Sequence, residues 1–336
     1  MRFFIKKAVT FHFSLYLCRR YSEEMKLLYY FIYSVLYLFS LLPMRVHYMI
    51  SDGFYLLIYY VIGYRRKVVR SNLTSSFPEK SAEEIRQIER GFYHWFCDYL
   101  VESVKMLSIS EANIRRRMVF KNIELMNECL ERGQSCVFYV GHYGSWEWIA
   151  SWTLWLSPKA VVAQIYHPIE NKAFDRLFLD VRQRFGSVSI PMQETLRKML
   201  EYRNAGKATV VGFVADQKPM WVNIHHWVDF LNHDTPVLTG TERIAKKLGT
   251  AVFYGDMRRI RRGYYETTVQ LMTDDPKSLP DYGITDIYYR LLETTIRREP
   301  SMWLWSHNRW SRTREEFDAR FEVIDGKVIA KKNTTA

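Results

Sequence analysis

The feature of this chain that most constrains its fold is the alternation of short apolar segments with amphipathic ones after residue 130. Five apolar segments are expected to be strands: Cys136–Val140, Ala160–Tyr166, Thr209–Ala215, Val252–Asp256 and Glu266–Leu271. Five amphipathic segments are expected to be helices: Trp146–Leu156, Lys172–Phe185, Gln193–Asn204, Leu238–Lys247 and Asp286–Arg298. Strands separated by helices bury a sheet on both faces, so the sequence predicts an α/β fold with a mixed central sheet flanked by helices.

The N-terminal part carries a different pattern, in which apolar runs lack charge. Leu27–Pro43 is just long enough to cross the hydrocarbon core of a membrane, whereas Gly53–Tyr64 is too short and suits an interfacial or re-entrant helix. Basic residues flank the two runs: Arg19, Arg20 and Lys26 before the first, and Arg65, Arg66, Lys67 and Arg70 after the second. The sequence therefore predicts an N-terminal hydrophobic membrane-anchor helix, with a pair of buried core helices as the alternative.

No internal repeat or low-complexity linker divides the chain, which favours one catalytic domain. The N-terminal residues lack a cleavage site, and Met25 begins a cleaner N-terminus, so we interpret what precedes it as a start-site extension. A capping box of Ser81 and Glu84 predicts a long helix that runs to about Leu107. The expected parts are the extension 1–24, an anchor and interfacial helix 25–64, a catalytic domain 65–320 and a tail 321–336.

Composition narrows the class of protein. The 336 residues are 48% hydrophobic, enough for a sizeable core, and the formal net charge of +12 favours anionic partners such as nucleic acid, lipid headgroups or an acidic protein. The four cysteines form no C-x-x-C pair, and Cys97 and Cys136 are expected to be buried thiols without a disulfide. His225, His226, His233 and Asp234 lack the spacing of metal ligands, so no metal or cofactor is predicted.

A strand-to-helix turn carries the candidate chemistry. The first apolar strand ends at Gly141, and His142 follows it, where open α/β sheets place their sites. Gly144 permits a tight turn, Ser145 is placed to cap the next helix, and Glu147 lies in that helix's first turn. A carboxylate beside an imidazole fixes its tautomer, so His142 and Glu147 predict a general base for a hydroxyl, with helix N-terminal amides stabilising the oxyanion.

Further motifs surround this turn in a fixed order: Arg70–Leu73 with Phe77–Glu79, Tyr166–Asp175 with Arg182–Gly186, Ala215–Gln217, Thr235–Ala245 and Met302–Trp310. Together with the H-x-x-x-x-E spacing of His142 and Glu147, they resemble the late acyltransferases of lipid A biosynthesis. This is the lauroyl/myristoyl transferase family of Gram-negative bacteria, which is similar to lysophospholipid acyltransferases. The resemblance covers about residues 25–315.

The resemblance implies an inner-membrane enzyme whose catalytic domain faces the cytoplasm. It would transfer an acyl chain from acyl carrier protein to a 3-hydroxyacyl chain of a lipid A precursor, without a cofactor. His142 is then the base and Glu147 its partner, while Arg182 matches the family arginine tied to activity. Asp216 matches the family's strand-end aspartate. The residues expected to bind substrate are Arg182, Arg184, Asp216 and Arg309.

The residues alone, without the family resemblance, leave other functions open. A basic, aromatic-rich chain suits nucleic-acid binding, although such a protein needs no uncharged anchor and no binding motif is recognised. A His–Glu pair can activate water, so a lipid or thioester hydrolase is an alternative, as is an acyltransferase for another membrane lipid. A non-enzymatic membrane scaffold would leave His142 without a role. The basic turn of Arg258, Arg259, Arg261 and Arg262 is either a solvated turn or a docking surface for carrier protein or lipid headgroups.

Overall fold

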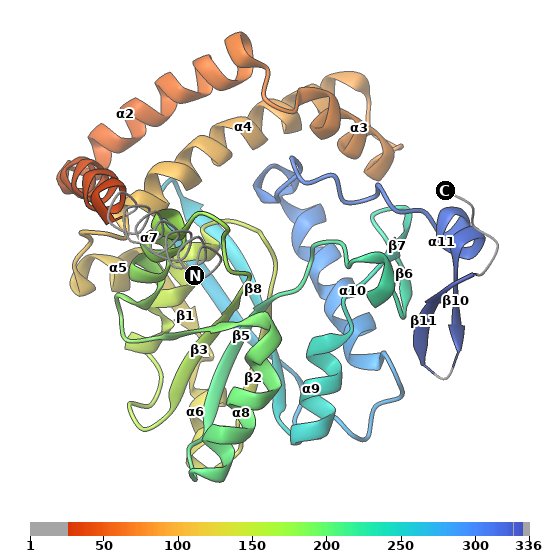
Figure 1. The fold of residues 1–336 in the computed structure, drawn as a ribbon. Helices are drawn as coiled ribbons and strands as arrows, with labels where there is room; N and C mark the ends of the chain where they lie inside the picture. The colour runs from red at the N-terminus through yellow and green to blue at the C-terminus, as the bar shows by residue number, and fades with distance from the viewer. Residues whose placement is uncertain (1–25, 325, 332–336) are drawn as a thin grey trace, which may run out of the picture.

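The computed structural model describes residues 26–324 and 326–331, so the extension predicted for residues 1–24 and Cys18 lie outside it. Its centre is a seven-stranded sheet in the order β1-β9-β8-β2-β5-β3-β4 (Figure 1). These strands are β1 Met118–Lys121, β2 Cys136–Val140, β3 Val161–Tyr166, β4 Val188–Pro191, β5 Thr209–Val214, β8 Ala251–Arg261 and β9 Tyr264–Thr273. Every pairing in this sheet is parallel except that of β8 with β9, which confirms the predicted mixed sheet.

The five predicted strands correspond to β2, β3, β5, β8 and β9. β8 and β9 extend beyond the predicted ends because their hairpin end carries arginines and polar residues that interrupt the apolar signal. β1 and β4 were not predicted. Each has four residues and lies at an edge of the sheet, so neither carries a run long enough to show a period.

Four of the helices that flank this sheet lie close to the predicted positions: α7 Lys172–Gln183, α8 Thr195–Asn204, α9 Gly240–Leu248 and α10 Gly283–Arg298. Two short helices, α5 Glu111–Arg117 and α6 Glu124–Glu131, were not predicted. One prediction needs correction. The segment expected to be the helix Trp146–Leu156 is a 3-10 helix, η2 Trp146–Leu154, and Ser145 stands at its N-cap without a side-chain capping bond. Short 3-10 turns occur at η3 Met192–Glu194, η4 Trp221–Asn223 and η5 Pro300–Met302.

Two small hairpins lie beyond α10, on the right in Figure 1. They are β6 Trp227–Phe230 with β7 His233–Pro236, and β10 Phe321–Ile324 with β11 Lys327–Ala330, the latter preceded by α11 Arg314–Arg320. A separate apolar cluster of Ile224, Phe317 and Phe321 holds this part together. The region expected to be a tail therefore contains a hairpin.

The N-terminal helices form an upper layer in Figure 1. They are Lys26–Leu41, α2 Met44–Tyr55, the π-helical η1 Leu56–Ile62, α3 Arg66–Ser76 and α4 Ala82–Lys105. α4 begins at the predicted capping box: the backbone N–H of Glu84 donates to Ser81 Oγ, and that of Ser81 donates to Glu84 Oε2. α2 packs along α4, so the apolar N-terminal segment is attached to the domain.

The predicted single spanning helix is not confirmed. Among the described residues no one helix has both the length and the apolar character to cross a membrane, and Lys26–Leu41 with Met44–Ile62 passes only as a pair bent by 114°. The alternative of a buried core pair does not fit either, because Leu27, Phe31 and Val61 are 70%, 68% and 75% exposed. This pair of segments presents an exposed apolar surface.

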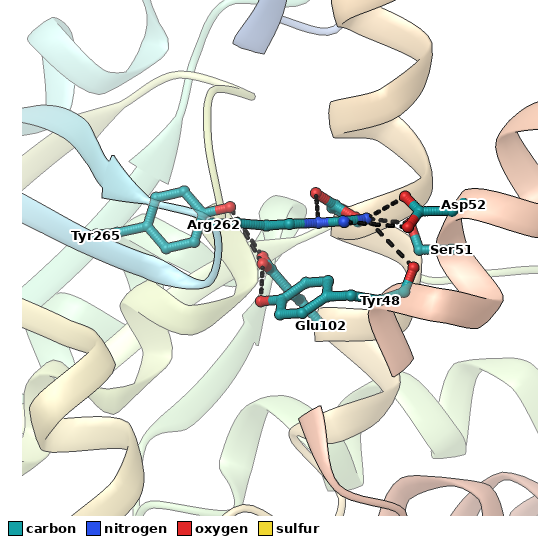
Figure 2. Close-up of polar contacts among 7 residues, drawn as sticks. Tyr48, Ser51, Asp52, Glu102, Arg262 and Tyr265 are labelled. Carbon is teal, nitrogen blue, oxygen red and sulfur yellow. Dashed lines mark hydrogen bonds and ion pairs between the residues drawn. The ribbon is translucent and has the colours of Figure 1, made fainter. Parts of the chain in front are cut away.

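Polar contacts join α2 to α4 and to the end of the β8–β9 hairpin, as Figure 2 shows. Arg262 Nη2 lies 2.6 Å from Asp52 Oδ1 on α2 and 2.6 Å from Asp98 Oδ1 on α4. The hydroxyls of Tyr48 and Tyr265 donate to the buried carboxylate of Glu102 at 2.9 and 3.0 Å. We call these residues, with Ser51, the hairpin–helix network.

These contacts bear on the two interpretations of the basic turn. Its four arginines have partners within the chain: Arg258 near Asp256, Arg259 with Glu299, Arg261 over the ring of Tyr264, and Arg262 with Asp52 and Asp98. Three of the four therefore sit beside carboxylates that offset their charge. The docking surface proposed for this turn loses its main support, because the arginines are not an unpaired basic patch.

Candidate active site

Two neighbouring parallel strands bring the candidate site together. β2 pairs with β5 so that Val140 lies opposite Val214. His142 and Asp216 each follow their strand by two residues, so the register places them side by side at the carboxyl edge of the sheet. His142 Nδ1 lies 2.6 Å from Asp216 Oδ1, and the backbone N–H of His142 donates to Asp216 Oδ2 at 2.9 Å.

Asp216 is buried and ionised. The indole N–H of Trp303 donates to its Oδ2 at 2.7 Å, in addition to the two bonds from His142. Burial by itself would raise the pKa of Asp216, but the charge and hydrogen bonds of His142, with the bond from Trp303, hold the pKa at about 2. A permanent carboxylate here orients the imidazole with Nδ1 as the donor, which leaves Nε2 as the basic nitrogen.

The Nε2 side of His142 is accessible. The His142 side chain is 19% exposed whereas that of Asp216 is 2% exposed. Gln217 Nε2 lies 3.3 Å from His142 Nε2, and the ring of Trp146 stands edge-on to the imidazole at 5.3 Å. An amide donor opposite Nε2 fits a lone pair on that nitrogen. A hydroxyl that replaces the amide would find an acceptor for its proton.

Glycines shape the turn that carries His142. Gly144 has a φ of +59°, as the predicted tight turn requires, and a Cβ there would overlap Met257 Sδ. Its N–H donates to the carbonyl oxygen of Met302, which binds the C-terminal motif to the turn. A Cβ at Gly141 would lie 2.7 Å from Leu292 of α10, so the strand end also packs too closely for a side chain.

Glu147 has a different partner from the one the sequence predicted. Its Oε1 and Oε2 accept from Nη2 and Nε of Arg182 at 2.6 and 2.8 Å. Among the described residues no hydrogen bond joins Glu147 to His142, and the carboxylate on the imidazole is that of Asp216. Burial would raise the pKa of Glu147, but Arg182 and, to a lesser degree, His142 hold it below its ordinary value. Glu147 therefore places negative charge near His142 without touching it.

The other predicted substrate-binding arginines have mainly internal contacts. Arg184 Nη1 donates to the carbonyl oxygens of Met106 and Ile109, just beyond the end of α4. Those bonds satisfy carbonyls of the turn that follows the helix, and no contact within residues 26–324 and 326–331 joins Arg184 to His142. Arg184 thus holds the turn between α4 and α5.

Arg309 is fully buried near the site. Its Nη2 donates to the carbonyl oxygen of Pro236 at 2.7 Å and to the hydroxyl of Tyr289 at 3.2 Å. Tyr289 in turn donates to the carbonyl oxygen of Ala215, the residue before Asp216. Nε and Nη1 of Arg309 have no partner within the described part of the chain. Arg309 is thus connected to the residue before Asp216 by the hydrogen bonds of Tyr289.

Sequence reasoning did not single out three residues that contact the His142–Asp216 pair. Trp303 donates to Asp216, Gln217 faces Nε2 of His142, and Trp146 borders the imidazole. Gln217 and Trp303 lie within motifs that the sequence did show, at a strand end and near the C-terminus. The available signal was that polar residues follow two buried strands, since parallel strands end at the same edge.

An imidazole oriented by a buried carboxylate at the carboxyl edge of an α/β sheet has the arrangement needed to accept a proton from a hydroxyl or from water. The model of the bacterial lipid A biosynthesis acyltransferase family matches residues 19–312, and the chain therefore belongs to this family. A curated relative is the lipid A biosynthesis acyltransferase of Haemophilus influenzae. It is 22% identical over 225 residues, which cover 64% of this chain and 69% of the relative. Membership supports acyltransferase activity and implies a lipid acceptor.

Proposed function

We propose that the protein transfers a fatty acyl chain from acyl carrier protein to a hydroxyl of a lipid A precursor, with His142 as general base. The observation that carries the proposal is the 2.6 Å contact between His142 Nδ1 and the buried, ionised Asp216. Family membership supports acyl transfer to a lipid. The net charge of +12 supports an acidic protein as the donor, because complementary fields raise the rate of encounter.

In the proposed reaction His142 Nε2 takes the proton of the acceptor hydroxyl while the hydroxyl oxygen attacks the thioester carbonyl. Asp216 stabilises the imidazolium that forms. The tetrahedral intermediate then collapses, the carbon–sulfur bond breaks, and the imidazolium gives its proton to the leaving thiolate. The products are the new ester and the free thiol of the carrier, and His142 is neutral again.

In this proposal Glu147 and Arg182 form a positioning pair. Glu147 engages Nε and Nη2 of Arg182, whereas Nη1 has no hydrogen bond to any described residue. Arg182 is 25% exposed, so substrate can reach it. We infer that its guanidinium stabilises the oxyanion that develops on the acyl carbonyl, and that Glu147 fixes its direction.

We further propose that the enzyme attaches to the cytoplasmic face of the inner membrane through Lys26–Leu41 and Met44–Ile62. The exposed apolar side chains of these segments fit the interfacial region of a bilayer, and Arg65, Arg66 and Lys67 follow directly at the level of the headgroups. This attachment would present the site to a hydroxyl carried by a lipid.

The proposal is tested by His142→Ala and Asp216→Asn in the purified full chain, with the product lipid measured by mass spectrometry. We expect each variant to fold and to lose about 10²–10⁴-fold in rate, because the positioned base or its orienting charge is gone. His226 and Asp286 form another His–Asp pair, at 2.7 Å, so His226→Ala and Asp286→Asn are matched controls that should retain activity. Near-normal transfer by His142→Ala would refute the mechanism.

Two further arms separate the alternatives. Donor incubated without acceptor should be nearly stable if the enzyme is a transferase, whereas acceptor-independent release of fatty acid would identify a hydrolase. Replacing carrier protein by coenzyme A as donor should lower kcat/KM, and the difference should shrink as salt rises. Equal use of both donors without salt dependence would remove the carrier protein from the proposal while leaving the base in place.

A further inference from the structure

A group of four cations without an acidic partner lies beside the proposed site. We call it the cation cluster: Arg65, Lys218, Arg309 and Arg312. Within residues 26–324 and 326–331 no carboxylate oxygen lies within 4 Å of any of them. By contrast, Arg182, Arg262 and Arg298 each pair with a carboxylate at 2.6 or 2.7 Å. The cluster therefore carries positive charge that the chain itself does not balance.

Contacts with the segment 306–312 hold the cation cluster together. Arg65 Nη1 donates to the carbonyl oxygen of Ser306 at 2.9 Å, and Lys218 Nζ donates to Oγ of Ser311. Arg309 and Arg312 belong to the segment. All of these acceptors are neutral, so they position the cations without offsetting their charge.

Two short links connect the cation cluster to the residues around His142. Lys218 is the next residue after Gln217, whose Nε2 lies 3.3 Å from His142 Nε2. Arg309 connects through Tyr289 to the carbonyl oxygen of Ala215, one residue before Asp216. A ligand held by the cluster would therefore lie next to His142.

Electrostatic effects within the cluster also favour the binding of an anion. Burial lowers the pKa of Lys218, and the charges of Arg312, Arg309 and Arg65 lower it further. Arg309 is fully buried, and two of its nitrogens lack a partner in the described part of the chain. A buried cation without a counter-charge is costly, so an anion bound here would relieve both the repulsion and the unmet hydrogen bonding.

We propose that the cation cluster binds the phosphate group of a phosphorylated membrane lipid, the acceptor, and so holds its hydroxyl at His142. The proposal rests on the proposed function and deepens it by naming the group of the acceptor that is recognised. Guanidinium and ammonium groups are the usual protein ligands of phosphate. A lipid source is favoured because Arg65 follows the exposed apolar segment Leu56–Ile62 by three residues, at the level expected for headgroups.

The kinetic test uses Lys218→Gln and Arg312→Gln in the full chain, with one acceptor lipid supplied with and without its phosphate. The wild type should use the dephosphorylated acceptor poorly. Each variant should raise KM for the phosphorylated acceptor about tenfold, the loss of one charge-assisted hydrogen bond, and should leave KM for the donor unchanged. Arg203→Gln and Lys207→Gln are matched controls. These exposed cations precede the amino end of β5, whereas Asp216 follows its carboxyl end.

Two kinetic outcomes would overturn the proposal. If the wild type uses both acceptors equally, the phosphate is not recognised. If the variants raise KM for the acyl donor instead, the cluster binds the phosphate of the carrier protein's prosthetic group rather than that of a lipid.

A binding measurement tests the site without turnover. Phosphatidylcholine vesicles with and without phosphatidic acid are mixed with wild type, Lys218→Gln and the control Lys207→Gln. Phosphatidic acid should strengthen binding of the wild type and of the control more than that of Lys218→Gln. Equal strengthening in all three proteins would contradict the cluster. The binding and transfer results can also differ. If phosphatidic acid strengthens binding through Lys218 but the wild type transfers no acyl chain, the phosphate site is supported and the proposed function is refuted.

Discussion

Two carboxylates near His142 have separate tasks at the scale of single residues. Asp216 contacts the imidazole and accepts three hydrogen bonds, whereas Glu147 gives both oxygens to Arg182. The two roles differ in what a substitution should do. Loss of Asp216 disturbs the base directly, whereas loss of Glu147 misdirects the guanidinium that is proposed to stabilise the oxyanion.

We predict that Glu147→Gln and Arg182→Gln each lower kcat by about 10²-fold, as expected when an oxyanion donor is lost or misplaced. If Glu147 acts through Arg182, the double variant should be no slower than either single variant. Steady-state kinetics of the four proteins measure this. The exposed pair Glu194 and Arg197, 2.7 Å apart on the surface, provides a control cycle without effect on rate. If the fold losses in kcat of the two single variants multiply in the double variant, the two residues act independently.

Glu102 predicts a pH dependence of stability. Burial, and then the charge of Asp98, raise the pKa of Glu102 from 4.5 to about 7. The folded state therefore binds this proton more tightly than the unfolded state. The stability that Glu102 contributes is fully present below its unfolded pKa and is lost as pH rises through about 7, a change of about 3 kcal/mol.

Glu102→Gln should remove this dependence because the amide does not titrate. Unfolding of wild type and variant is followed at a series of pH values in detergent, and the variant should gain stability relative to wild type as pH rises. Glu128→Gln, an exposed position on α6, is the control and should show a constant difference. A constant difference for Glu102→Gln as well would mean that folding does not raise the pKa of Glu102.

The hairpin–helix network decides at the scale of elements how α2 is attached. Gly263 closes the β8–β9 hairpin with a φ of +72°, and a Cβ at this position would overlap the hydroxyl of Tyr48 on α2. Tyr48 in turn donates to Glu102 on α4. The hairpin end therefore acts as a close-fitting support for the helix that carries the exposed apolar surface.

We predict that Gly263→Ala destabilises the protein by more than Gly133→Ala. Both glycines have positive φ, +72° and +77°, so both substitutions cost about 1 kcal/mol of backbone strain, but Gly133 has nothing within 4 Å of its Cβ position. The excess cost at Gly263 then comes from the close contacts of its Cβ, of which that with Tyr48 is the shortest and that with Arg117 Nη1 follows at 3.0 Å. Adding Tyr48→Phe to Gly263→Ala should recover part of it, which denaturant unfolding of the single and double variants measures. Equal costs at the two glycines would show that α2 moves freely away from the hairpin.

Attachment to lipid is a property of the whole molecule, since it depends on a surface assembled from Lys26–Leu41 and Met44–Ile62. We predict that Val61→Glu and Phe31→Glu each weaken binding to vesicles by about tenfold, because a charge replaces an apolar side chain that would enter the bilayer. Vesicle sedimentation measures this binding. Leu271→Glu on β9 is the control, since Leu271 is 48% exposed but lies outside this surface. Unchanged binding of both variants would contradict the proposed attachment.

Short-range patterns were sufficient for the parts of the fold that depend on neighbouring residues. The capping box at Ser81, the strand Cys136–Val140 and the tight turn at Gly144 follow from caps, apolar runs and backbone freedom, which act over a few residues. The order of the motifs also predicted the family that the comparison confirmed. The type of η2 was missed, because a 3-10 helix and an α-helix share much of their local sequence pattern.

The choice of partners could be decided only by the tertiary structure. Glu147 is five residues from His142 in the chain, yet Arg182 of α7 engages both of its oxygens. Asp216 is 74 residues away and reaches the imidazole, because β5 lies beside β2 in parallel register. Likewise Arg262, which belongs to a basic turn in the sequence, is offset by Asp52 and Asp98 from two helices. The sequence by itself determined that His142 and Asp216 each follow an apolar strand. Which charges meet depended on strand adjacency and helix packing, since these interactions join segments that the local sequence does not relate.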